Sequence, residues 1–120
     1  MADTYKVAVA SSDGIVVNQH FGHSRSFYIY DVSGDTAAFT GEIRMLVPVC
    51  QTGNHDDDRL TENLRALSDC KYLLVQKIGT EAAARAESLG ISPYEIPDII
   101  GDAINKLVSY EKVQNLFKKG

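Results

Sequence analysis

Two short polar segments hold most of the side chains that could bind a metal. The first, residues 18–26, carries His20, His23 and Arg25 around Gly22. Imidazole nitrogens ligate zinc and iron, and an arginine can pair with an anionic ligand. A glycine lets the backbone curl or approach a ligand closely. Spacing alone also leaves a simpler interpretation, because two histidines in a polar loop are more often just solvated.

The second segment places Cys50 and His55 on either side of four residues that include Gly53. Thiolate and imidazole are ligands that suit zinc or iron–sulfur centres. Together with His20 and His23 they make a conceivable set of four ligands, although the chain has no Cys-x-x-Cys pair. For Cys50, a structural role and a functional role are equally compatible with this pattern.

Apolar and turn residues predict the elements that carry these segments. The first half reads as strands joined by short turns, which favours an antiparallel meander, and these strands cover residues 6–11, 26–32 and 37–47. The second half alternates helices and strands, over residues 58–67, 70–75, 81–89, 91–96 and 98–119. Thr80 is the expected N-cap of the helix over 81–89, and Gly90 its left-handed end. Cys70 begins an apolar strand, where burial is its simplest explanation.

This element order, β-β-β-α-β-α-β-α, predicts the fold class. Short antiparallel connections followed by βα crossovers give one mixed five-stranded sheet covered by helices, an α/β fold. The sequence shows no internal repeat or linker, so residues 1–120 are expected to form a single domain.

Bulk composition narrows the partners and the compartment. The chain has 120 residues, a net charge of −4 and no basic run longer than Lys118-Lys119, which argues against a nucleic-acid partner. It has no apolar stretch of the roughly 20 residues that a membrane span needs. Two cysteines and an N-terminus without a signal-peptide pattern indicate a reducing cytoplasm.

A series of short motifs runs in order through nearly the whole chain. The motifs are Val7 to Gly14, His20-Phe21-Gly22, Phe27 to Val32, Val47 to Cys50, Leu67 to Cys70, Ile78-Gly79 and Leu89 to Ile91. In these motifs the chain resembles the dinitrogenase iron–molybdenum cofactor biosynthesis family, which includes NifX, NafY and the C-terminal domain of NifB. The His-Phe-Gly motif before an aromatic strand is the most specific part of the resemblance.

The resemblance implies a ribonuclease H-like fold and a non-catalytic carrier or accessory protein. Its cargo would be an iron–sulfur cluster or an iron–molybdenum cofactor precursor, received from a donor protein and passed to an acceptor. The implied cofactor-binding residues are His20, Phe21, Gly22, Arg25 and Cys50. His20 is the first candidate metal ligand and Cys50 the second, with His23 and His55 as weaker candidates. Arg25 or backbone N–H groups would offset the charge of the cluster.

The sequence also bears on three other functions. A mononuclear zinc or iron site could use the same histidines and Cys50. A metal-free interaction module could dock partners through the last helix, with Tyr110 and Phe117 as anchors. A two-metal nuclease is excluded, because the first strand offers no carboxylate before Asp13 and that mechanism needs several converging carboxylates.

Overall fold

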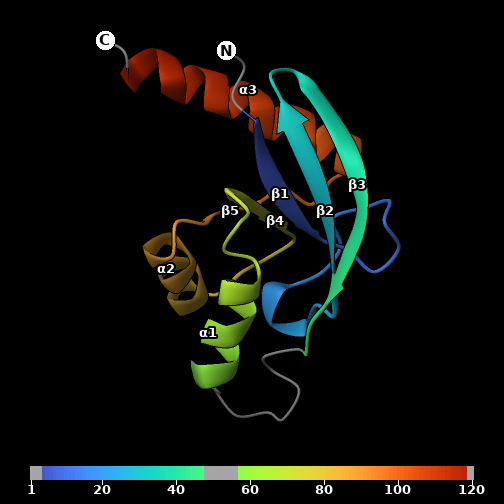
Figure 1. The fold of residues 1–120 in the computed structure, drawn as a ribbon, viewed down its shortest axis with the longest axis vertical. Coiled ribbons are helices and arrows are strands. Elements are labelled where there is room, and N and C mark those ends of the chain that lie inside the picture. Colours follow the sequence, from blue (N-terminus) through green and yellow to red (C-terminus); the bar gives the residue numbers. More distant parts are fainter. Residues whose placement is uncertain (1–3, 48–56, 119–120) are drawn as a thin grey trace.

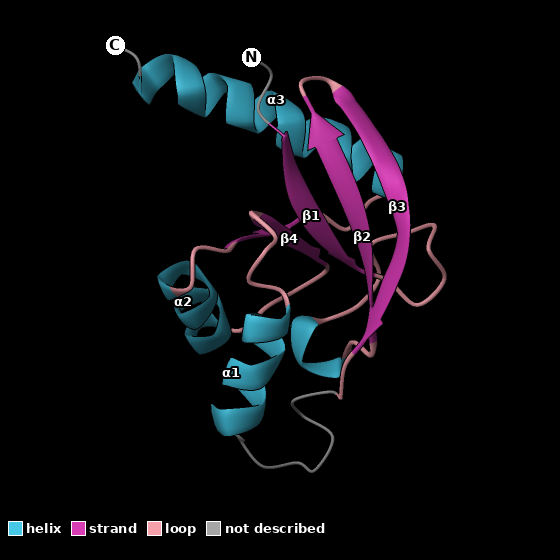
Figure 2. Ribbon diagram, in the orientation of Figure 1, coloured by secondary structure: helices cyan, strands magenta, loops and turns pink. Residues whose placement is uncertain are grey.

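One mixed sheet of five strands organises the chain, with helices on both of its faces (Figure 1). The computed structural model describes residues 4–47 and 57–118. The strands are β1 (Thr4–Ala10), β2 (Ser26–Ser33), β3 (Thr36–Met45), β4 (Tyr72–Val75) and β5 (Ser92–Glu95). The α-helices are α1 (Asp57–Ala66), α2 (Thr80–Ser88) and α3 (Ile100–Lys118), and a single 3-10 turn, η1, covers Phe21–His23 (Figure 2). The predicted order of strands and α-helices is confirmed, whereas η1 was not predicted.

The strands lie in the order β3-β2-β1-β4-β5. β1 pairs antiparallel with β2, and β2 with β3, so the first three strands form the predicted meander. β4 pairs parallel with both β1 and β5, which requires the crossover connections that α1 and α2 provide. β1 therefore lies at the centre of a single α/β domain.

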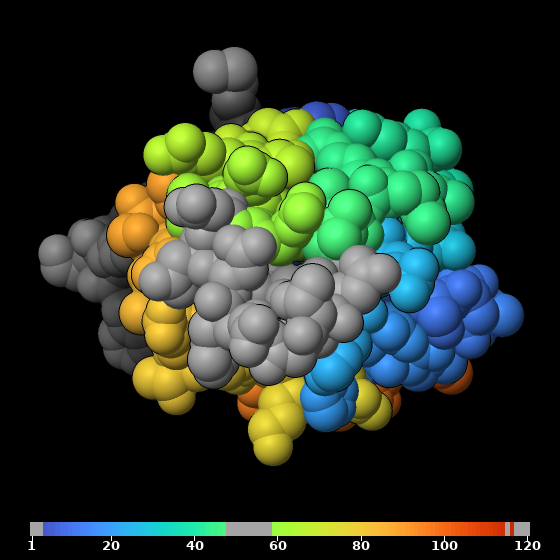
Figure 3. Space-filling model, turned by 90° about the horizontal axis from the view of Figure 1, so that it is seen from below, coloured from blue at the N-terminus to red at the C-terminus, as the bar shows by residue number. Residues whose placement is uncertain are grey.

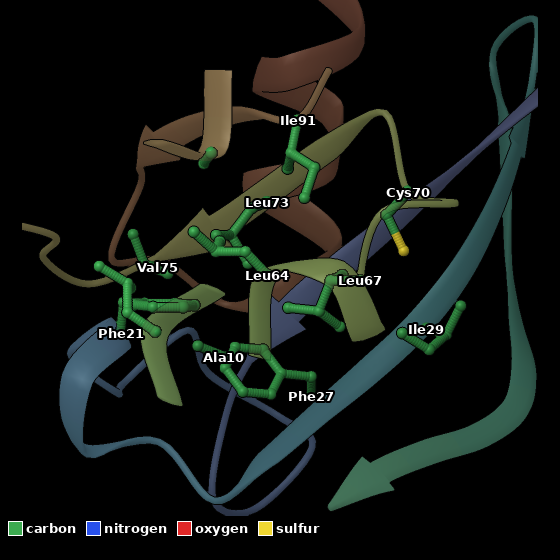
Figure 4. Packing of buried hydrophobic residues seen from close by; sticks show 13 residues of the cluster. Ala10, Phe21, Phe27, Ile29, Leu64, Leu67, Cys70, Leu73, Val75 and Ile91 are labelled. Atoms are coloured by element: carbon green, nitrogen blue, oxygen red, sulfur yellow. The ribbon is translucent and has the colours of Figure 1, made fainter. Parts of the chain in front are cut away.

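Alternating side chains of the central strands supply two separate cores. Ala8 and Ala10 of β1 belong to the core on the face covered by α1 and α2. Figure 4 shows this core, which holds Leu64 and Leu67 of the α1 region together with Leu73 of β4. Further labelled members are Phe21, Phe27, Ile29, Cys70, Val75 and Ile91. All four residues of β4 are buried, which confirms the burial on both faces that the apolar run predicted.

The opposite face is covered by α3. The apolar stripe predicted for this helix is buried, and it consists of Ile100, Ala103, Ile104, Leu107 and Val108. Glu111 extends the stripe as a buried acid, and its carboxylate accepts the Tyr72 hydroxyl at 2.6 Å and pairs with Lys71 at 3.0 Å. Burial, reinforced by Glu111, raises the pKa of Tyr72, so this phenol stays protonated as the donor. A buried charge thus has the partners that its burial requires.

Two helix starts differ from the sequence prediction. Thr80 is not the N-cap of α2, because the Ala83 amide bonds to the Gly79 carbonyl at 2.9 Å and makes Gly79 the capping residue. Gly90 is left-handed as predicted, with φ 85°. The last helix begins at Ile100 rather than at residue 98. The Asp98 carbonyl instead accepts the Val17 amide at 2.9 Å, which ties this segment to the loop after β1.

Replacing Leu73 by alanine tests the first core. Leu73 is fully buried in β4, so Leu73→Ala is expected to lower the free energy of unfolding by about 2–5 kcal/mol. Leu116 is 73% exposed on α3, and Leu116→Ala is expected to change stability by less than about 0.5 kcal/mol. Urea unfolding followed by circular dichroism measures both, and equal losses would contradict the assignment of the core.

Candidate functional site

The C-terminal ends of β1, β4 and β5 meet at one edge of the sheet, because these three strands are parallel. The loop from β1 to β2 crosses this edge. There the Gln76 amide donates to the Gln19 carbonyl at 2.9 Å, and the Phe21 amide donates to the Lys77 carbonyl at 2.9 Å. Figure 3 looks at this edge from below and shows light-blue residues of the loop beside yellow residues that follow β4. Ligands of open α/β sheets commonly bind at such an edge.

His20 and His23 are brought together by η1. The His23 amide donates to the His20 carbonyl at 3.0 Å, which closes the turn. Residues three apart in a 3-10 turn project to the same side, and the two imidazole centroids are 6.1 Å apart. Both side chains are exposed. The turn thus presents a pair of imidazoles to solvent at the edge where β1 and β4 end.

Phe21 anchors this turn to the core of the domain. Its side chain is 3% exposed and its ring lies 5.9 Å from that of Phe27 in the core. With Phe21 directed inward, the flanking His20 is directed outward. Gly22 has a negative φ, so the turn does not depend on a left-handed glycine. What Gly22 contributes locally is the absence of a side chain between the two histidines.

The start of the same loop is held by a compact turn after β1. The Asp13 carboxylate accepts the amides of Ile15 and Val16 at 2.9 and 3.1 Å. These bonds lower the pKa of Asp13. Gly14 has φ 75°, and a Cβ built there would lie 2.7 Å from the Tyr28 ring, so glycine is required at this position.

Two basic side chains flank the histidine turn. Arg25 follows it and is exposed, and its carbonyl accepts the Leu46 amide at 2.8 Å, so the end of β3 lies beside it. Lys77 is the bridge partner of His20 and is also exposed. Neither side chain has an ion pair within residues 4–47 and 57–118. Sequence reasoning missed Lys77, although its place just after the buried strand that ends at residue 75 was a usable signal.

The remaining predicted ligands, Cys50 and His55, lie outside the described residues. The described chain reaches Val47, whose carbonyl accepts the Asn63 side-chain amide at 2.7 Å. Within the described ranges, no three side chains of His, Cys, Asp or Glu converge as a metal site. Of the predicted site residues, His20, Phe21, Gly22, His23 and Arg25 therefore have a described geometry, and the structure adds Lys77 beside them.

Cys70 is confirmed as a buried residue. Its side chain is 1% exposed, and burial, aided by the neighbouring Asp69, raises the pKa of the thiol to about 12. A thiol with so high a pKa is protonated at neutral pH, whereas metal ligation requires the thiolate. Cys70 thus belongs to the core rather than to the site.

The sheet edge and its exposed turn are typical of a small α/β binding domain. The sequence matches the model of the dinitrogenase iron-molybdenum cofactor family over residues 3–110, and the chain belongs to this family. In the part of the chain that is described, no helix is long and apolar enough to span a membrane.

Named relatives differ in how much of their length the chain covers. NifB of Bradyrhizobium diazoefficiens, an FeMo cofactor biosynthesis protein, is 36% identical over 78% of this chain, which covers 19% of NifB. Protein NifX of Sinorhizobium fredii is 33% identical over 84% of this chain and 66% of NifX. The chain thus spans about a fifth of the former protein and about two thirds of the latter.

Solved structures share the fold. The crystal structure of PH0822 has a TM-score of 0.63 and 29% identity, covering 87% of this chain and 88% of that one. A protein from Methanocaldococcus jannaschii has a TM-score of 0.58 and covers 91% of this chain and 92% of its own. At 13% identity, the second likeness concerns the fold alone.

The reactivity of Cys70 checks the geometry of the core. In a Cys50→Ser variant, Cys70 is the only thiol, and its raised pKa and burial predict no measurable reaction with Ellman's reagent at pH 8 in the native state. Unfolding in guanidinium chloride is expected to release one thiol at the ordinary rate. Rapid reaction of the native variant would contradict the burial of this side chain.

Proposed function

We propose that this protein is a non-catalytic carrier or accessory protein for a precursor of the iron–molybdenum cofactor or a related iron–sulfur cluster. The observation that carries the proposal is the anchored turn that presents His20 and His23 at the edge of the sheet, between Arg25 and Lys77. Membership of the dinitrogenase iron-molybdenum cofactor family supports this cargo. Its partners would be the proteins that deliver and receive the cluster in a reducing cytoplasm.

The chemistry of the turn suits a cargo that is held and then released. A neutral imidazole of His20 would supply one nitrogen to an iron atom. Arg25 and Lys77 would offset the negative charge of a sulfide-containing cluster without forming bonds to iron. With few protein ligands, the cluster keeps coordination positions for an acceptor. We assign Cys50 as the second ligand, with His23 and His55 in lesser roles.

We also assign the fold to the ribonuclease H-like class. The strand order β3-β2-β1-β4-β5, with β2 antiparallel to its neighbours, supports this assignment. Catalysis of the kind that this class often performs is not part of the proposal. β1 contains no carboxylate among residues 4–10, so the central strand lacks the ligands of a two-metal site.

A mononuclear zinc or iron site is the second candidate. The observation that favours it is the approach of the His20 and His23 rings in one turn. Such a site would still need further ligands, for which Cys50 and His55 are the candidates. Metal content and the ratio of sulfide to iron distinguish this site from a bound cluster.

Anaerobic loading tests the carrier function. The protein is incubated with an iron–sulfur precursor cluster and desalted, and iron, sulfide and zinc are measured. We expect the wild type to retain iron and sulfide. His20→Ala should retain at least about tenfold less of both, because a direct ligand is lost. His23→Ala is the matched control within the same turn and is expected to lose less.

Two results would reject the carrier. Zinc retained without sulfide would identify the mononuclear site instead. No metal retained by the wild type would contradict both metal functions. Equal retention by His20→Ala and wild type would leave a cluster carrier but remove His20 as the ligand.

Lys77 is expected to contribute through charge alone. Lys77→Ala should weaken cluster binding by about two- to fivefold at low ionic strength, whereas Lys77→Arg should bind as the wild type does. The difference should shrink in high salt, because exposed charges are screened. Titration of the apoprotein with the cluster, followed by visible circular dichroism, measures the three affinities. A salt-independent loss would contradict the electrostatic role.

A further inference from the structure

A shallow groove of about 510 Å³ runs between α2 and β5. α2 packs beside β5 (Figure 1). The groove exists because α2 presents small side chains, Ala83 and Ala84, where larger ones would fill the space. The other lining residues are Ile78, Thr80, Glu87, Pro93, Tyr94 and Glu95.

The charged side chains that line this groove are all acidic. Glu87 and Glu95 line it, and no lysine or arginine does. One oxygen of Glu95 accepts the Ile78 amide at 2.9 Å, which fixes the carboxylate at the mouth of the groove. The Glu87 carboxylate lies close enough to Tyr94 to add to the rise in the pKa of that phenol, which burial and Tyr110 cause first.

These two carboxylates differ from most others in the described part of the chain. Most acidic side chains elsewhere in the described ranges have a basic partner, as in the pairs Asp31–Lys6, Asp69–Arg44, Glu81–Arg85, Asp98–Lys106 and Glu111–Lys71. Glu87 and Glu95 have none within the described ranges. Two unpaired carboxylates beside an apolar floor are complementary to a cation that is carried between apolar groups.

Pro93 affects how a partner could bind at the edge strand β5. β5 is the last strand of the sheet, and Pro93 removes a backbone donor from it. Pro93 therefore disfavours the addition of a partner strand at this edge and leaves side chains in the groove as the means of recognition.

We propose that the α2–β5 groove docks a segment of a partner protein in which a lysine or arginine stands between apolar residues. The cation would lie between Glu87 and Glu95, and its apolar neighbours would cover Ala84, Pro93 and Tyr94. The groove begins at Ile78, next to Lys77, the bridge partner of His20. A partner docked here would lie beside the cargo turn. That last consequence rests on the proposed function, whereas the binding of the segment does not.

Peptide titration of the whole, metal-free protein tests the groove. The probe is the N-acetylated, C-amidated tripeptide Leu-Arg-Leu, compared with peptides that carry glutamine or glutamate at the central position. Amide chemical shifts in the ¹⁵N–¹H NMR spectrum report the site. We expect shifts centred on Thr80, Ala84, Glu87 and Glu95 with the arginine peptide, weaker shifts with glutamine and none with glutamate.

Variants connect this binding to the groove. Glu87→Gln should weaken binding of the arginine peptide about two- to fivefold. Ala84→Leu should weaken it further by filling the groove. Asp102→Asn is the matched control, because it removes an exposed carboxylate from α3 without breaking an ion pair of the described chain.

Several results would overturn the proposal. These are no binding of the arginine peptide, equal binding of the three peptides, or shifts centred outside the groove. Unchanged affinity in both Glu87→Gln and Ala84→Leu would also overturn it. If n-butylammonium bound as tightly as the peptide, the groove would be a site for small amines and not for a protein segment. None of these measurements involves iron, so their failure is separate from failure of the cluster-loading experiment.

Discussion

The parallel pairing of β1 with β4 is the constraint on which the rest of the structure depends. It joins the antiparallel first half of the chain to the crossover-built second half, and it divides the core between two faces. The same pairing continues past the strands as the contacts of Gln19 and Phe21 with Gln76 and Lys77. These contacts fix the position of the histidine turn relative to the centre of the sheet, although the turn belongs to a loop. A ligand site on such a support keeps its geometry with little ordering cost on binding.

Much of the fold could be predicted because its signals are local. The apolar run that ends at Val75, the stripe that begins with Ile100 and the left-handed Gly90 each specify an element within a few residues. The order of strands and helices then leaves few topologies. The start of α3 was harder, because a tertiary contact between Asp98 and Val17 decides where that helix begins.

The geometry of the candidate site was less predictable than the fold. His20, His23 and Arg25 could be found by residue type, yet their meeting depends on η1 and on the burial of Phe21, which no periodicity indicates. Lys77 lies beside the candidate site only through the pairing of segments that are more than fifty residues apart in sequence. The α2–β5 groove could not be predicted from the sequence either. It arises from alanines, which in the sequence indicate only a strong tendency to form a helix.

The two backbone hydrogen bonds that fasten the loop to the segment after β4 also set how the loop can open. Both must break before the histidine turn can leave the sheet, and they lie directly after β4, a strand that is buried along its whole length. Local opening of the turn is thus coupled to fraying of the central sheet, a process that amide hydrogen exchange resolves. Under the proposed carrier function, release of a cluster would therefore follow the lifetime of its own bonds, without a slow rearrangement of the protein.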